Sequence, residues 1–189
     1  MKVIQTNKVL DAKGLACPMP IIRTKKAIDQ LKPGQVMEVQ ATDKGSTADI
    51  QAWARSTGHH YIGTLEDGTV LKHYLRKALP EEETTETHHS NVMDLDTLRK
   101  KIEGKENITI LDVRESAEYA FGHIPGAKHI PLGELEERFD ELEKDAEIYV
   151  VCRSGHRSDR ASQALTKKGF SKVVNVIPGM SSWEGPIEK

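Results

Sequence analysis

The first part of the chain alternates between a helical and a strand-like spacing of hydrophobic residues. Residues 20–31 place Ile21, Ile28 and Leu31 on one helical face and charged side chains on another, which predicts an amphipathic helix. The other predicted elements are a weak strand at 9–11, a strand at 36–41, a helix at 49–56, and strands at 61–65 and 70–75. This order predicts a small α+β sandwich.

The second part of the chain has continuous apolar runs, as strands buried on both faces of a sheet do. These runs are residues 108–113, 148–152 and 173–177. Helical patterns at 132–142 and 157–168 lie between them, so we expect an α/β domain with a central parallel sheet flanked by helices. Ligands of such folds bind at the carboxyl ends of the strands, and Cys152 lies at one of these ends.

The segment 80–91 separates the two patterns. It contains four glutamates, no basic residue and no apolar residue beyond Pro80, so it cannot bury surface. We expect an acidic flexible linker here, between a first domain at 1–79 and a second at 92–189.

Composition narrows the class of protein. The chain has 189 residues, of which 37% are hydrophobic and 30% charged, and its net charge is −2. It shows neither a membrane-spanning apolar run nor the apolar core of a signal peptide, so we expect a cytoplasmic protein without membrane contact. Neither half is basic enough to predict nucleic-acid binding. Its two cysteines are expected to be reactive or buried rather than a structural disulfide.

Cys152 lies between a buried strand and a helix, in a loop that contains glycine and two arginines. Loop N–H groups, the helix dipole and nearby cations all favour a thiolate. An ordinary buried cysteine at a strand-to-helix turn is the alternative, but the combination favours a nucleophile. The residues expected to form its anion-binding loop are Arg153, Ser154, Gly155, His156, Arg157 and Ser158.

Other polar residues near this strand edge leave alternatives open. Asp112 and Arg114 form either a structural ion pair, which we favour, or a contact to the Cys152 loop. His156 either tunes the charge of the loop and contacts the donor, or is an exposed loop residue. The pairs His59-His60 and His88-His89 lack other ligands at metal-site spacing, so we expect no metal.

Four short motifs follow one another along the second half of the chain. They are Asp112-Val113-Arg114 at a strand end, Gly-His-Ile-Pro-Gly-Ala at 122–127, Cys-Arg-x-Gly-x-Arg-Ser at 152–158, and Pro178-Gly179 followed by Trp183. They resemble the rhodanese family of sulfurtransferases over nearly all of residues 92–189, although Pro178 stands where that family commonly has glycine. The resemblance implies that Cys152 carries sulfur as a persulfide.

Protein-tyrosine and cell-cycle phosphatases use a related cysteine loop. They place the arginine one residue further from the cysteine than Arg157 is from Cys152, and usually have histidine where Val151 stands. The shorter loop predicts a cradle suited to one sulfur atom rather than a phosphate group. Sulfur transfer is therefore favoured over phosphatase or arsenate-reductase activity.

Cys17 precedes the first predicted helix. Pro18 and Pro20 fit a first helical turn, so we expect the helix dipole to lower the pKa of the thiol, with Arg23 and Lys26 one or two turns away. On the residues alone, a small buried side chain where strand meets helix is an equal alternative. The basic side chains either dock an acidic partner or form a solvated face.

Residues 10–20, which end in Cys-Pro-Met-Pro, resemble the leader and Cys-Pro-x-Pro signature of the TusA/SirA-like sulfur-carrier family. The resemblance spans roughly residues 7–78, with Asp43-Lys44 where family members often have Asp-Pro. It implies that Cys17 carries a persulfide and hands it to a protein partner.

Together the two resemblances imply a persulfide relay. Cys152 takes sulfane sulfur from a small donor, thiosulfate or a glutathione-type persulfide, and passes it to Cys17 and then to a downstream protein. No metal or organic cofactor is required. The alternative is a redox-sensing or sulfur-binding module with a reversible Cys17–Cys152 disulfide.

Overall fold

The computed structural model describes residues 3–79, 82 and 88–189. It divides into two compact units, Met1–Pro80 and Glu81–Lys189, each with its own hydrophobic core. Of the linker expected at 80–91, residues 80–81 and 83–87 lie outside the described residues.

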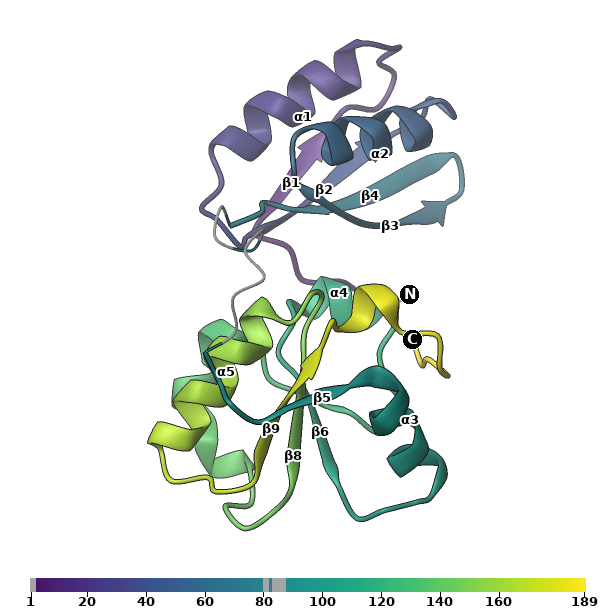
Figure 1. Ribbon diagram of the computed structural model, residues 1–189. Helices are drawn as coiled ribbons and strands as arrows, with labels where there is room; N and C mark the ends of the chain where they lie inside the picture. The colour runs from purple at the N-terminus through teal and green to yellow at the C-terminus, as the bar shows by residue number, and fades with distance from the viewer. Residues whose placement is uncertain (1–2, 80–81, 83–87) are drawn as a thin grey trace. The chain divides into compact units, whose positions relative to one another are not determined.

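The first unit is a four-stranded sheet with both helices on one face (Figure 1). The strand order is β1-β2-β4-β3, in which β1 and β2 are parallel and the other neighbours antiparallel. The elements are β1 Lys8–Asp11, α1 Met19–Asp29, β2 Val36–Ala41, α2 Ser46–Ser56, β3 His60–Asp67 and β4 Val70–Arg76. The predicted α+β sandwich is confirmed.

Successive side chains of β2 point to opposite faces of the sheet, and this alternation explains how one face packs against the two helices. Met37 and Val39 point to the face that carries the helices, where they pack with Ile28 of α1 and Ile50 of α2. Helix α2 begins earlier than expected, at Ser46, because both the N–H and the hydroxyl of Ser46 donate to the carbonyl of Asp43.

The second unit is a five-stranded parallel sheet in the order β5-β9-β8-β6-β7. Its strands are β5 Val92–Asp94, β6 Thr109–Asp112, β7 Lys128–His129, β8 Ile148–Val151 and β9 Val173–Ile177. Its helices are α3 Leu95–Glu103, α4 Ser116–Phe121 and α5 His156–Lys167, with short 3-10 helices η2 Leu132–Glu137, η3 Phe139–Glu141 and η4 Met180–Ser182. The predicted parallel α/β domain is confirmed.

Two hydrophobic clusters cover the two faces of this sheet. Val150 of β8 points into the cluster under α5 and η2, with Leu135 and Leu165. Its neighbour Val151 points into the opposite cluster under α3 and η4, with Leu98. Helices therefore flank both faces, as Figure 1 shows.

One predicted helix in this unit is wrong. Residues 132–142 form η2 and η3 instead of a single α-helix, with a break at Arg138, whose φ is −121°. The side chain of Arg138 binds Glu134 on one side of the break and Glu141 on the other. This bent arrangement still buries Leu135 and Phe139 in the core.

Candidate active site

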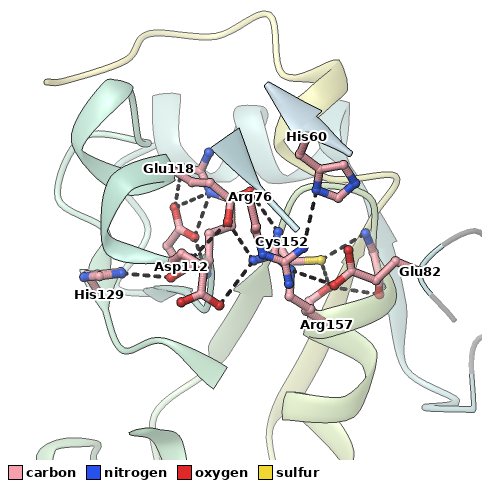
Figure 2. Close-up of polar contacts among 12 residues, drawn as sticks. His60, Arg76, Glu82, Asp112, Glu118, His129, Cys152 and Arg157 are labelled. Atoms are coloured by element: carbon pink, nitrogen blue, oxygen red, sulfur yellow. Dashed lines mark hydrogen bonds and ion pairs between the residues drawn. The ribbon is translucent and has the colours of Figure 1, made fainter. Parts of the chain in front are cut away.

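The loop after β8 curls around the sulfur of Cys152. The N–H of Gly155 donates to Sγ at 3.1 Å, and the hydroxyl oxygen of Ser158 lies 3.3 Å from Sγ (Figure 2). The same hydroxyl donates to the carbonyl of Gly155 at 3.0 Å. Gly155 has a φ of +97°, and a Cβ there would lie 2.9 Å from Ile177 Cγ2, so this position requires glycine.

A second turn, after β9, donates hydrogen bonds to the carbonyls of the Cys152 loop. The N–H of Met180 donates to the carbonyl of Cys152 at 2.7 Å, and the N–H of Ser181 donates to that of Arg153 at 3.0 Å. Gly179 makes this approach possible, because a Cβ there would lie 2.6 Å from the oxygen of Cys152. Proline at 178 therefore leaves the close contact intact, since the next residue makes it.

Arg157 lies in the first turn of α5, but its guanidinium binds a carboxylate. Its two terminal nitrogens donate to Glu118 of α4 at 2.7 and 2.8 Å, and both side chains are buried. Nε lies 3.7 Å from Glu82. Burial opposes the charge of Arg157, but the negative charge of Glu118 outweighs this effect and raises the pKa above its usual range.

Sequence reasoning missed Glu118. Its only local signal is the capping box at the start of α4, in which Glu115 and Glu118 bond each other's backbone N–H groups. That signal places the helix but does not reveal a partner that is distant along the chain.

The other predicted loop residues differ in exposure. Arg153 and Ser154 are exposed, so their side chains are free to meet a donor. His156 is half-buried, and its Nδ1 is a buried atom without a hydrogen-bond partner among the described residues. Arg153 is therefore the cation of this loop that reaches solvent.

Asp112 and Arg114 form a buried ion pair. Arg114 Nε donates to both carboxylate oxygens of Asp112, at 2.9 and 3.0 Å, and Nη2 donates to Oδ2 at 2.6 Å. Nη2 also donates to the carbonyl of Gly122 at 2.8 Å, and His129 binds the carbonyl of Arg114 at 2.9 Å (Figure 2). Among the described residues, the side-chain hydrogen bonds of the pair do not reach the Cys152 loop.

Cys17 is exposed, just before the start of α1. Contrary to the expectation of a lowered thiol pKa, the interaction with the Asp49 carboxylate raises the pKa of Cys17, and partial desolvation and the charges of Asp49 and Asp43 act in the same direction. These acidic side chains act in the direction opposite to the one expected from the dipole of α1.

The remaining predicted residues near Cys17 lie on α1 or at its start. Pro18 is exposed, whereas Pro20 is buried and its carbonyl accepts from Thr24 at 2.8 Å. Arg23 and Lys26 are exposed, and the charge of Arg23 acts on Asp11. Among the described residues, the charged groups that shift the pKa of Cys17 are Asp49 and Asp43 rather than Arg23 or Lys26.

In the second unit, a buried cysteine at a strand end accepts a backbone N–H in a loop that leads into a helix, and the first unit presents an exposed cysteine before a helix. Together these two sites define a two-domain sulfur-transfer protein. The family model for the rhodanese-like domain matches residues 94–186, and the model for sulfurtransferase TusA matches residues 8–77. Among the described residues, no helix has both the length and the apolar character to cross a bilayer.

The chain is also similar to individual proteins of known sequence or structure. YrkF of Bacillus subtilis (strain 168), named as a candidate sulfur carrier, is 52% identical over 186 residues, which cover 98% of this chain and 100% of YrkF. YtwF of the same organism, named as a candidate sulfurtransferase, is 47% identical over 88 residues, 47% of this chain and 84% of YtwF. A rhodanese-related crystal structure from Thermoplasma volcanium is 34% identical, with a TM-score of 0.48, and covers 52% of this chain and 97% of that one.

The chain therefore belongs to the family of proteins that join a TusA sulfur-carrier domain to a rhodanese-like domain. It contains a sulfurtransferase and a sulfur carrier in one polypeptide, which is the composition of a sulfur relay.

Proposed function

We propose that Cys152 takes sulfane sulfur from a small donor, thiosulfate or a low-molecular-weight persulfide. The thiolate of Cys152 attacks the outer sulfur of the donor. With thiosulfate, the new S–S bond forms as the bond to the sulfite sulfur breaks, and sulfite leaves with the electron pair. The enzyme retains the outer sulfur as a persulfide.

The cradle around Sγ of Cys152 is the observation that carries this proposal. A donated N–H at 3.1 Å and the start of α5 stabilise negative charge on the sulfur, before and after loading. The exposed Arg153 is placed to attract an anionic donor. Because Glu118 binds Arg157, that arginine fixes the loop instead of contacting the donor.

In the second half of the proposed reaction, Cys17 attacks the outer sulfur of the Cys152 persulfide. An S–S bond forms at Cys17, the S–S bond at Cys152 breaks, and Cys152 leaves as a thiolate. A downstream protein thiol then takes the sulfur from Cys17. A cytoplasmic location, where thiols stay reduced, suits this chemistry.

Mass spectrometry of the intact chain and its peptides tests the relay. After exposure to thiosulfate or glutathione persulfide, we expect one added sulfur at each cysteine. Cys152→Ser should abolish donor-dependent loading of Cys17, whereas Cys17→Ser should leave loading of Cys152 intact. Normal loading of Cys17 in the Cys152→Ser variant would refute the proposed direction.

A further inference from the structure

The carbonyl oxygen of Gly155, in the loop around Cys152, has three hydrogen-bond donors. It accepts from the N–H of Asp159 at 3.1 Å and from Ser158 Oγ at 3.0 Å. Nδ2 of Asn175 donates to the same oxygen over a longer distance, 3.4 Å. Because a carbonyl oxygen has two lone pairs, the two shorter bonds already satisfy it. The amide of Asn175 is therefore a third donor that this carbonyl does not need in the arrangement observed.

Asn175 is a polar residue in an apolar and fully buried position. It lies in β9 on the same face as Val173, which packs with Leu165 of α5. Its backbone is fixed on both sides, by Val92 of β5 and Val150 of β8. Oδ1 of its amide is buried without a hydrogen-bond partner among the described residues. An amide that is paired so poorly costs stability relative to an apolar side chain, so stability does not explain its presence.

The hydroxyl of Ser158 has one hydrogen and two acceptors within reach. The hydrogen goes to the carbonyl of Gly155 at 3.0 Å, and Sγ of Cys152 lies 3.3 Å from the same hydroxyl oxygen. While Cys152 is a thiol, its own hydrogen can point to Ser158 Oγ. Once the thiol has lost its proton to water, the sulfur only accepts, and a hydrogen bond to its negative charge is stronger than one to a carbonyl. Ionisation therefore favours a turn of the hydroxyl from the carbonyl to the sulfur.

We propose that Asn175 is a positioning residue for sulfur transfer, which frees the Ser158 hydroxyl to bind the Cys152 thiolate. When the hydroxyl turns away from the carbonyl of Gly155, Nδ2 of Asn175 closes on that carbonyl in its place. The carbonyl then keeps two donors, Asp159 N and Asn175 Nδ2, so the exchange leaves no buried oxygen underpaired. The inference rests on the function proposed above, in which the same thiolate attacks the donor and is released when the sulfur is passed on.

Charged side chains also act on this sulfur, and a test must leave them unchanged. Those in the loop or next to it are Arg153, His156, Arg157 and Asp159 on the loop and α5, Glu118 on α4, Glu82, and the pair Asp112 and Arg114 at the end of β6. Arg157 is bound to Glu118, and Arg153 is exposed. A neutral substitution in β9 keeps all of these charges, so a change in the ionisation of the sulfur then reports its hydrogen bonds.

Ultraviolet absorbance of the thiolate tests this proposal in the full chain with Cys17→Ser, where Cys152 is the single thiol. The same chain with Cys152→Ser added provides the baseline. We expect Asn175→Val to raise the midpoint of the titration by about half to one pH unit, because the turn of the hydroxyl then costs the carbonyl a hydrogen bond. Loading of Cys152 by thiosulfate at a pH below the midpoint should slow by about threefold to tenfold. Asn175→Ala adds no bulk to the core and provides the same test if Asn175→Val does not fold.

A double-mutant cycle separates this exchange of donors from a general effect on the loop. Ser158→Ala should itself raise the midpoint by about one pH unit, and adding Asn175→Val should change it no further, because no hydroxyl remains to turn. Ser162→Ala is the matched control: it removes a buried hydroxyl of α5 that has no hydrogen-bond partner among the described residues, and it should leave the midpoint unchanged. The titration requires no sulfur transfer, so a failed relay leaves it intact. An unchanged midpoint in Asn175→Val, or an equal shift with and without the Ser158 hydroxyl, would overturn the proposal.

Discussion

The guanidinium of Arg157 lies near the reactive sulfur, yet its hydrogen bonds go to Glu118. A buried cation must be paired, and a bidentate carboxylate satisfies both its charge and its hydrogen-bond donors. The consequence for the site is that the N–H of Gly155, the start of α5 and the exposed Arg153 are among the groups left to stabilise an anionic sulfur. Arg157 instead ties α5 to α4.

Breaking this pair should destabilise the second unit. Glu118→Gln leaves the buried Arg157 poorly compensated, so we expect a loss of about 3 kcal/mol in the free energy of unfolding. Urea unfolding followed by Trp183 fluorescence, with Trp53→Phe to isolate the signal, measures it. Glu134→Gln removes an exposed ion pair to Arg138 and should cost about 1 kcal/mol or less. Equal losses in the two variants would contradict this assignment.

His73 makes the stability of the first unit depend on pH. Burial lowers the pKa of His73 from 6.5 to about 4. As the pH falls through this window, the unfolded chain takes up a proton that the folded chain does not, so stability decreases with acidification and levels off below about pH 4. The expected loss is about 3 kcal/mol at most.

Urea unfolding at several pH values measures this effect, with Trp53 as reporter and Trp183→Phe to remove the other signal. His73→Gln should flatten the dependence between neutral pH and about pH 4. A parent protein that is equally stable across this window would show that His73 is protonated in the folded state.

Local sequence predicted the reactive residues but not their partners. Cys152 and Cys17 stand in motifs whose spacing is readable along the chain. Glu118 reaches Arg157 only through tertiary packing, and the carboxylates of Asp49 and Asp43 reverse the expected direction of the pKa shift of Cys17. Electrostatic character at a site depends on side chains that approach from other elements, which a local motif does not record.

At the scale of elements, the Cys152 loop is held between two strand ends. The turn between β9 and η4 donates to its carbonyls, and Asn175 of β9 donates to the carbonyl of Gly155 at 3.4 Å. These contacts hold the loop around Sγ, and the close approach of the β9–η4 turn needs Gly179.

Gly179→Ala should therefore impair loading of Cys152. Its new Cβ would lie 2.6 Å from the carbonyl oxygen of Cys152, so the two turns must separate. We expect about a hundredfold lower rate of persulfide formation, measured by mass spectrometry at timed quenches. Gly133→Ala is the matched control, because a Cβ there meets no atom within 4 Å. A normal rate in Gly179→Ala would show that the turn does not position the loop.

Long apolar runs predict the central strands, whereas the short elements of the second unit have no comparable pattern in the sequence. The expected strand at 36–41 has the bounds of β2. β5, α3, α4 and β7 were not expected, since two- or three-residue strands carry too few positions to show a period and α4 is a single short helix. Helix α3 had a readable signal in Asp94, whose side chain accepts from the N–H of Thr97.

At the scale of the whole molecule, the chain enters the second unit beside its reactive loop. The N–H groups of His88 and His89 donate to Asp159 at 3.0 and 2.8 Å, and His89 Nε2 lies 3.0 Å from the carbonyl of Val173. Asp159 belongs to the first turns of α5, which follows the Cys152 loop. The end of the expected linker is thus fixed to the helix that follows the sulfur-loading loop.

Because the two units belong to one chain, we expect sulfur to pass from Cys152 to Cys17 within that chain. Covalent linkage gives an effective concentration of about 1 mM, so at about 1 µM protein the intramolecular transfer should be about a thousandfold faster than transfer between chains. Timed mass spectrometry after loading measures it in the parent chain. A mixture of preloaded Cys17→Ser with Cys152→Ser reports transfer between chains, which should scale with concentration. If the parent rate also falls in proportion on dilution, the two cysteines exchange sulfur between molecules, and the fusion serves to recruit two carriers rather than to join two steps.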